Sequence, residues 1–103
     1  MTTGAILMNS NDNVATSLTD LIAGCRVIIR SKLGHEERIV IAAEDIPFGH
    51  KIAIRTIDLG EDIVKYGHRI GEATAPIAAG QHVHVHNLRS IRGRAAVAEA
   101  AAE

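Results

Sequence analysis

Short apolar runs alternate with turn-forming residues along most of this chain. Four runs are rich in β-branched and other strand-favouring side chains: residues 26–30, 38–41, 51–55 and 82–86. They are separated by clusters containing glycine, proline or aspartate that are typical of tight turns: residues 32–34, 45–47, 58–61, 66–67 and 79–80. The pattern predicts a mainly β domain built of short strands rather than repeated β-α-β units.

One segment near the N-terminus has a helical pattern instead. Asp12 or Asn13 offers a helix N-cap, and the apolar residues that follow recur at the spacing of one helix face: Val14, Leu18, Leu21 and Ile22. Gly24 then stands where a helix commonly ends. We therefore expect one short amphipathic helix at about residues 12–22.

Composition narrows the function classes. The chain has 103 residues, 47% of them hydrophobic, which fits one globular domain. A net charge of −1 and an aromatic content of 2% argue against binding to nucleic acid or to an anionic membrane surface. No apolar stretch approaches the ~20 residues of a membrane span, and no signal peptide is visible. We expect a cytoplasmic protein, with an Arg/Ala-rich and flexible tail at residues 89–103.

The segment from His82 to Asn87 is the strongest candidate for chemistry, because histidine and valine alternate strictly along it. In a strand Val83 and Val85 would enter the core, and three histidines would line the other face about 6.6–6.8 Å apart. Two adjacent imidazoles can lean together onto one metal ion, but three cannot easily do so. The alternatives are a row of imidazoles that hydrogen-bonds a polar ligand, or a solvated strand face.

Two further segments carry cations beside possible ligand groups. His50 and Lys51 follow Pro47 and Gly49 at the start of a predicted strand, and a lysine next to a histidine suits a ligand with a carboxylate. Lys65 and Tyr66 precede Gly67, where an ammonium and a phenol can bind an oxyanion. In each case the alternative is a solvated charge at a strand edge or hairpin. His35 and His68 are expected to be solvated turn residues.

Several of these segments occur in an order that resembles one known family. They are residues 46–54, 64–67, 70–74 and 79–87, together with the opening Asn11–Ala15. The set resembles the SAF domain of the altronate/galactarate dehydratase family, and is similar to the small subunit of sulfolactate sulfo-lyase. The resemblance covers roughly residues 5–88. It implies a β-clip fold for residues 1–88, with short strands and one small helix.

The resemblance also implies a function. In that family the domain is fused to a large catalytic domain or is a separate small subunit, so we expect a carbon–oxygen lyase subunit that forms 2-keto-3-deoxy acids and is inactive without its large partner. The alternatives are a sulfolactate sulfo-lyase subunit and a non-catalytic module that binds carbohydrate acids. Self-association is a further expectation, with Arg89, Arg92 and Arg94 placed to reach acidic residues of a partner.

The expected site residues follow from the same reasoning. A divalent metal, iron(II) by the resemblance, would be shared with the large lyase subunit and bound by His84 and His86. His50 and His84 are the expected catalytic residues. The expected substrate-binding residues are Lys51, Lys65, Tyr66, His82 and Asn87.

Overall fold

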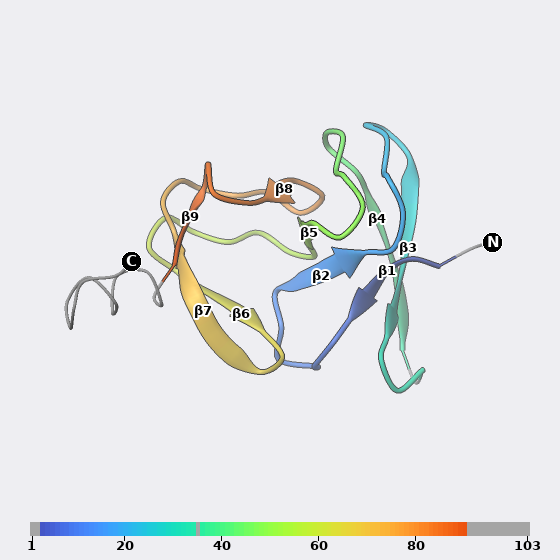
Figure 1. The fold of residues 1–103 in the computed structure, drawn as a ribbon, viewed down its shortest axis with the longest axis horizontal. Helices are drawn as coiled ribbons and strands as arrows, with labels where there is room; N and C mark the ends of the chain where they lie inside the picture. Colours follow the sequence, from blue (N-terminus) through green and yellow to red (C-terminus); the bar gives the residue numbers. More distant parts are fainter. Residues whose placement is uncertain (1–2, 35, 91–103) are drawn as a thin grey trace.

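The computed structural model describes residues 3–34 and 36–90, and in those ranges the chain is mainly β, as predicted (Figure 1). The larger sheet has six strands in the order β4-β3-β1-β2-β5-β8. Their bounds are β1 (Thr3–Leu7), β2 (Val14–Ser17), β3 (Arg26–Ser31), β4 (Glu37–Ile41), β5 (Lys51–Ala53) and β8 (His82–Val83). Only β1 and β3 run parallel; every other neighbouring pair in this sheet is antiparallel.

A smaller antiparallel sheet lies beside the β5–β8 end of the first (Figure 1). Its order is β6-β7-β9, with β6 (Asp62–Lys65), β7 (His68–Ala73) and β9 (Leu88–Ser90). Strand β9 pairs with β7 as far as Ser90, two residues beyond Leu88, where the sequence placed the end of the domain. Arg89 lies opposite Glu72 and Ser90 opposite Gly71. The predicted tail, including Arg92 and Arg94, otherwise falls outside the described residues.

The helix predicted for residues 12–22 is wrong, because this segment contains strand β2 and a loop. Strand β2 lies between β1 and β5 and is covered on both faces. Ala15 packs in one hydrophobic core and Val14 in the other, so adjacent residues are both buried. Burial on two faces, followed by a loop that buries Leu21, produces an apolar spacing that imitates a helical one. None of the described residues forms a helix that could cross a membrane.

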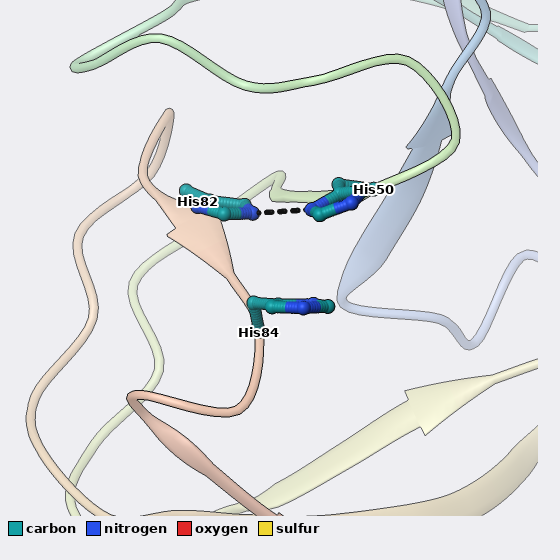
Figure 2. A group of neighbouring side chains, drawn as sticks. All are labelled: His50, His82 and His84. Carbon is teal, nitrogen blue, oxygen red and sulfur yellow. Dashed lines mark hydrogen bonds between the residues drawn. The ribbon is translucent and has the colours of Figure 1, made fainter.

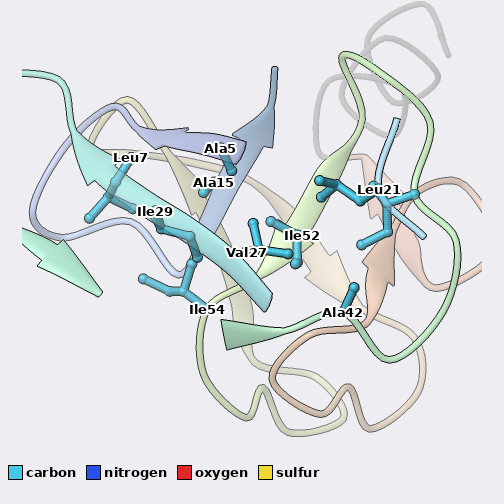
Figure 3. Close-up of a cluster of buried hydrophobic side chains, with 10 residues drawn as sticks. Ala5, Leu7, Ala15, Leu21, Val27, Ile29, Ala42, Ile52 and Ile54 are labelled. Carbon is cyan, nitrogen blue, oxygen red and sulfur yellow. The ribbon is translucent and has the colours of Figure 1, made fainter. Parts of the chain in front are cut away.

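The two cores divide the apolar residues by face. The first fills one side of the larger sheet with alternate residues of β1 and β3, namely Ala5 and Leu7, and Val27 and Ile29 (Figure 3). The second lies between the β2–β5–β8 region and the smaller sheet, and contains Val14, Ala53, Ile57, Ile63, Ala73, Ile77 and Val83. Because β2 and β5 contribute to both cores, they fix the position of one sheet relative to the other.

Four copies of one loop connect the strands at irregular intervals in the sequence. Each begins with a buried aliphatic residue and reaches a glycine with positive φ three residues later: Leu21 and Gly24, Ile46 and Gly49, Ile57 and Gly60, Ile77 and Gly80. The aliphatic residues form two antiparallel bridges, Leu21 with Ile46 and Ile57 with Ile77. In every copy the glycine N–H donates a hydrogen bond to a carbonyl near the bridged partner loop, that of the residue four positions before the partner's aliphatic residue. Gly24, for example, donates to the Ala42 carbonyl, four positions before Ile46. The domain therefore has an internal pseudo-symmetry that no fixed sequence period reveals.

This repeated loop delivers the candidate site residues. His50 and Lys51 directly follow the glycine of the second copy, and Gln81 and His82 follow that of the fourth. Glycine is required at Gly80, because its φ is 93° and a Cβ atom there would lie 2.0 Å from the Ile41 carbonyl oxygen. The tight passage of the chain at Gly80 brings β8 alongside β5.

Candidate functional site

Three histidines in or next to two adjacent strands, β5 and β8, meet at the edge of the larger sheet. The β5–β8 pairing sets Lys51 opposite Val83. Because the strands are antiparallel, His50, which precedes β5, is brought level with His84, which follows β8. His82 lies one residue inward, opposite Ile52. Figure 2 shows the three rings facing one another, with His82 and His84 from one segment and His50 from the other. We call this group the histidine trio.

The rings of the histidine trio are in close contact. Nδ1 of His50 lies 2.9 Å from Nε2 of His82, a hydrogen bond between two imidazoles. The His50 and His84 rings stack with centroids 4.3 Å apart and planes 24° apart. One nitrogen from each ring can be chosen so that all three lie within 4.8 Å of one another. A tetrahedral ion with bonds of about 2.0–2.1 Å holds its nitrogens ~3.3 Å apart, so the rings would have to come closer together to hold a metal.

Burial and neighbouring charges lower the pKa of two of the three rings, His82 and His84. Burial, followed by the proximity of His50, lowers the pKa of His82, and the carboxylate of Glu44 opposes this only in part. Burial, then His50 and Lys51, lower the pKa of His84. A lowered imidazole pKa favours the unprotonated ring, which is the form that binds a metal or accepts a proton.

The predicted continuous strand through His86 is shorter in the structure. Strand β8 ends at Val83, and residues 84–87 form a turn closed by a hydrogen bond from the Asn87 N–H to the His84 carbonyl. Val83 is buried as expected, but Val85 is 80% exposed, so its predicted place in the core is wrong. His86 stays near the trio, its ring centroid 5.2 Å from that of His82, but it does not belong to the group that converges on one point.

Asn87 shapes this turn from within. Its side chain is buried, its Nδ2 donates to the His82 carbonyl, and its Oδ1 accepts from the His84 N–H. Both ends of the amide are therefore engaged by the backbone beside two trio members. Its observed contacts orient His82 and His84, while a direct contact with substrate stays a prediction.

A cleft of about 680 Å³ gathers three of the other predicted site residues. Lys51, Lys65 and Tyr66 line it together with His68 and Arg69. Lys51 lies on the same side of β5 as Ala53, which packs against the smaller sheet, so its ammonium faces the hairpin of β6 and β7. Burial, then the like charge of Lys65, lower the pKa of Lys51. We call this feature the lysine cleft; none of the described residues that line it belongs to the trio, and the two are connected through Lys51, which follows His50 and whose charge lowers the pKa of His84.

Tyr66, in the cleft wall, has a backbone conformation that is unfavourable for its residue type. The hairpin pairs Lys65 with His68, and the two residues between them, Tyr66 and Gly67, have φ of 58° and 76°. Such two-residue turns favour Asn-Gly, because a bulky residue at positive φ is strained. Asp12 holds the conformation, since its carboxylate accepts from the Tyr66 and Gly67 N–H groups at 2.9 and 2.8 Å.

Three residues that sequence reasoning missed support the site. Asn13, fully buried, accepts from the Val64 N–H and donates to the Asp62 carbonyl, so with Asp12 it ties the smaller sheet to β2. The Asp-Asn pair was interpreted as a helix cap, and the same side-chain chemistry serves a different backbone here. Glu44 accepts a hydrogen bond from the His82 N–H at 3.0 Å. No sequence signal marked Glu44, because it becomes a neighbour of His82 only through the repeated loops.

Comparison with known proteins decides the family. The model of the altronate/galactarate dehydratase SAF domain matches residues 3–91. This chain belongs to that SAF domain family. The matched region includes every residue of the histidine trio and the lysine cleft.

The SAF domain also has curated relatives of two kinds. It is 41% identical over 85 residues to altronate dehydratase of Escherichia coli (strain K12) and 38% identical over 86 residues to that of Bacillus subtilis (strain 168). In each case the match covers 82% of this chain but 16% of the relative. It is 28% identical over 88 residues to (2R)-sulfolactate sulfo-lyase subunit alpha of Chromohalobacter salexigens, covering 84% of this chain and 94% of that protein. The homologues are lyases, and this chain spans a small part of the dehydratases.

Proposed function

We propose that this SAF domain is the histidine- and lysine-bearing part of a sugar-acid dehydratase of the altronate/galactarate type, and that it acts only with a large catalytic lyase subunit or domain. The observation that carries the proposal is the junction at His50 and Lys51. His50 belongs to the three converging imidazoles, and the next residue, Lys51, lines the cleft together with Lys65. A dehydratase acting on a hydroxy acid needs both a proton acceptor and cations for the carboxylate.

The reaction is a β-elimination. A base takes the C2 proton of a 2,3-dihydroxy acid, the C3–O bond breaks, and the hydroxyl leaves as water once it has gained a proton. The enol that remains becomes the 2-keto-3-deoxy acid by tautomerisation. His84, whose lowered pKa favours the unprotonated ring, or the adjacent His50 can accept or return a proton, a role that typically contributes ~10²–10⁴-fold to the rate. The lysines favour the enolate-like form by holding negative charge on the carboxylate.

A divalent metal fits the histidine trio. Three imidazole nitrogens within 4.8 Å, two of them on rings with a lowered pKa, form a donor set that suits iron(II), zinc or a similar ion. His50, His82 and His84 would hold the metal, and when bound it would act as a Lewis acid toward a substrate oxygen. Asn87 and Glu44 then orient the trio through the backbone of His82 and His84.

A sulfo-lyase subunit is the second candidate. The match covers nearly the whole of a sulfolactate sulfo-lyase alpha subunit. Sulfolactate elimination begins at the same kind of C2 proton, but the C3–S bond breaks and sulfite leaves. The trio and the cleft suit both reactions, so only analysis of the products can identify the leaving group.

Reconstitution tests the proposal. The chain is assayed alone and with a purified large subunit of each lyase type, using altronate, galactarate and sulfolactate, and the products are measured as 2-keto acid and sulfite. We expect no turnover by the chain alone and formation of 2-keto acid without sulfite on reconstitution with the dehydratase subunit. Sulfite release would replace the proposal with the sulfo-lyase function, and absence of both products would leave a binding module.

A variant pair connects turnover to the trio. His84→Gln keeps polarity and approximate size, so the chain should fold and bind its partner while reconstituted turnover falls at least ~10-fold. Val85→Thr changes an exposed neighbour in the same turn and should retain wild-type turnover. Equal turnover in the two variants would remove the trio from the mechanism.

A further inference from the structure

Two lysines of the lysine cleft lack counter-charges in the described part of the chain. The third cation of the wall, Arg69, is engaged by Asp62 at 2.6 Å and by Glu72 at 3.5 Å. No ion pair of Lys51 or Lys65 occurs among the described residues; Lys65 instead lies 5.4 Å above the ring of Tyr66. Two ammonium groups that repel each other and face a concave space form a site for an anion.

The size and wall of the cleft indicate a small ligand. Its volume of about 680 Å³ lies within the ~300–1,000 Å³ typical of small-molecule sites. The Tyr66 phenol and the His68 imidazole add hydrogen-bonding groups next to the ammonium groups. Cations together with a phenol and an imidazole match a carboxylate that carries neighbouring hydroxyl groups.

The turn conformation supports the same conclusion independently. Asparagine would suit the positive φ of position 66 better than tyrosine, and the buried Asp12 is used to hold the tyrosine there. A residue that opposes the conformational preference of its own turn, and is held there by a side chain from elsewhere in the fold, is typical of a functional position. The side chain of Tyr66, held in this unfavourable turn conformation, lines the cleft.

We propose that the lysine cleft is a carboxylate-binding subsite for a small hydroxy acid, with Lys51 and Lys65 on the carboxylate and Tyr66 on an adjacent hydroxyl. This deepens the proposed function and rests on it for the identity of the substrate class. Binding itself needs no turnover, so it can be measured on this chain without a large subunit.

The test uses the fact that the sequence has three lysines, Lys32, Lys51 and Lys65. The full chain is labelled with ¹³C at lysine Cε, the signals are assigned with single Lys→Arg variants, and tartrate, a 2,3-dihydroxy dicarboxylate, is added stepwise at constant pH. We expect tartrate to shift the Cε signals of Lys51 and Lys65 in a saturable way, because both ammonium groups line the cleft that would hold its carboxylate. Exposed Lys32 is the internal control and should not respond.

A variant and a salt control complete the design. Lys65→Met should weaken tartrate binding about fivefold, the equivalent of ~1 kcal/mol, whereas Lys32→Met should not change it. Sodium chloride at equal ionic strength should not reproduce the Lys51 response. Equal responses of Lys32 and Lys51, or no response to tartrate, would overturn the subsite. Either result leaves the lyase proposal standing, because that is decided by reconstituted turnover.

Discussion

Nδ1 of His50 lies 2.9 Å from Nε2 of His82, so one of these imidazoles donates a proton to the other. The contact holds when the two rings share one bridging proton and is lost when both facing nitrogens carry one. A metal ion held by the trio would compete with this contact for ring nitrogens, so such an ion would couple metal binding to proton binding at this pair.

Metal binding by the isolated chain should follow the trio and not the sequence spacing. We expect Co²⁺ or Zn²⁺ titration at neutral pH to show a site that His50→Gln, His82→Gln and His84→Gln each weaken at least about tenfold, since each removes one ligand. Absorption of Co²⁺ or calorimetry measures the affinity.

His86→Gln is the deciding variant in that series. The sequence predicted that His84 and His86 bind the metal, whereas the structure groups His84 with His50 and His82. Loss of affinity in His86→Gln with none in His50→Gln would favour the sequence prediction and contradict the trio.

Stability should fall as the pH decreases through the range in which histidine titrates. The pKa values of His82 and His84 are lowered in the folded chain, so just below the unfolded value of about 6.5 the unfolded state binds more protons. The free energy of unfolding then decreases as the pH falls through about 6.5, and these two groups add no further loss below their lowered folded pKa values. Urea denaturation at a series of pH values measures the slope.

The double variant His82→Gln/His84→Gln should flatten this slope. His68→Gln, which changes an exposed histidine of β7, is the matched control and should keep the trio's contribution to it. An unchanged slope in the double variant would mean that the trio is not destabilised by protonation.

Tyr66→Asn should separate stability from function. Asparagine accepts positive φ, which favours the variant by about 1 kcal/mol, and loss of the contact between Lys65 and the ring costs about 0.5 kcal/mol. We expect a free energy of unfolding about 0.5 kcal/mol above wild type, together with weaker tartrate binding. Tyr66→Phe keeps the ring and the strain, and so isolates the hydroxyl. A variant that is destabilised and binds tartrate normally would show that Tyr66 serves only the hairpin.

Asn13→Ala should be strongly destabilising for a polar substitution. The Asn13 side chain is fully buried and bonds the Asp62 carbonyl and the Val64 N–H, both of which would be left unpaired. We expect a loss of about 3 kcal/mol in the free energy of unfolding, measured by denaturant titration. Asn11→Ala, at an exposed position nearby, should change the stability by less than about 0.5 kcal/mol.

Local chemistry in the sequence determined a large part of this protein. β-branched runs and turn residues predicted a mainly β fold, and five of the six positive-φ glycines in the described residues lie in or beside predicted turns: Gly34, Gly49, Gly60, Gly67 and Gly80. His50, His82 and His84 were identified as candidates because alternation and neighbouring charge are visible along the chain. Lys51, Lys65 and Tyr66 were found in the same way, and all three line one cleft.

The tertiary structure alone decided which of these residues meet. His50 joins His82 and His84 because β5 and β8 pair across more than thirty residues, a register that no local pattern encodes. Asp12 and Asn13 bond the hairpin of β6 and β7 instead of capping a helix, since the same side chains satisfy any backbone that burial brings within reach. Strand β2 imitated a helix because it is buried on both faces, and only the packing of two sheets creates that burial.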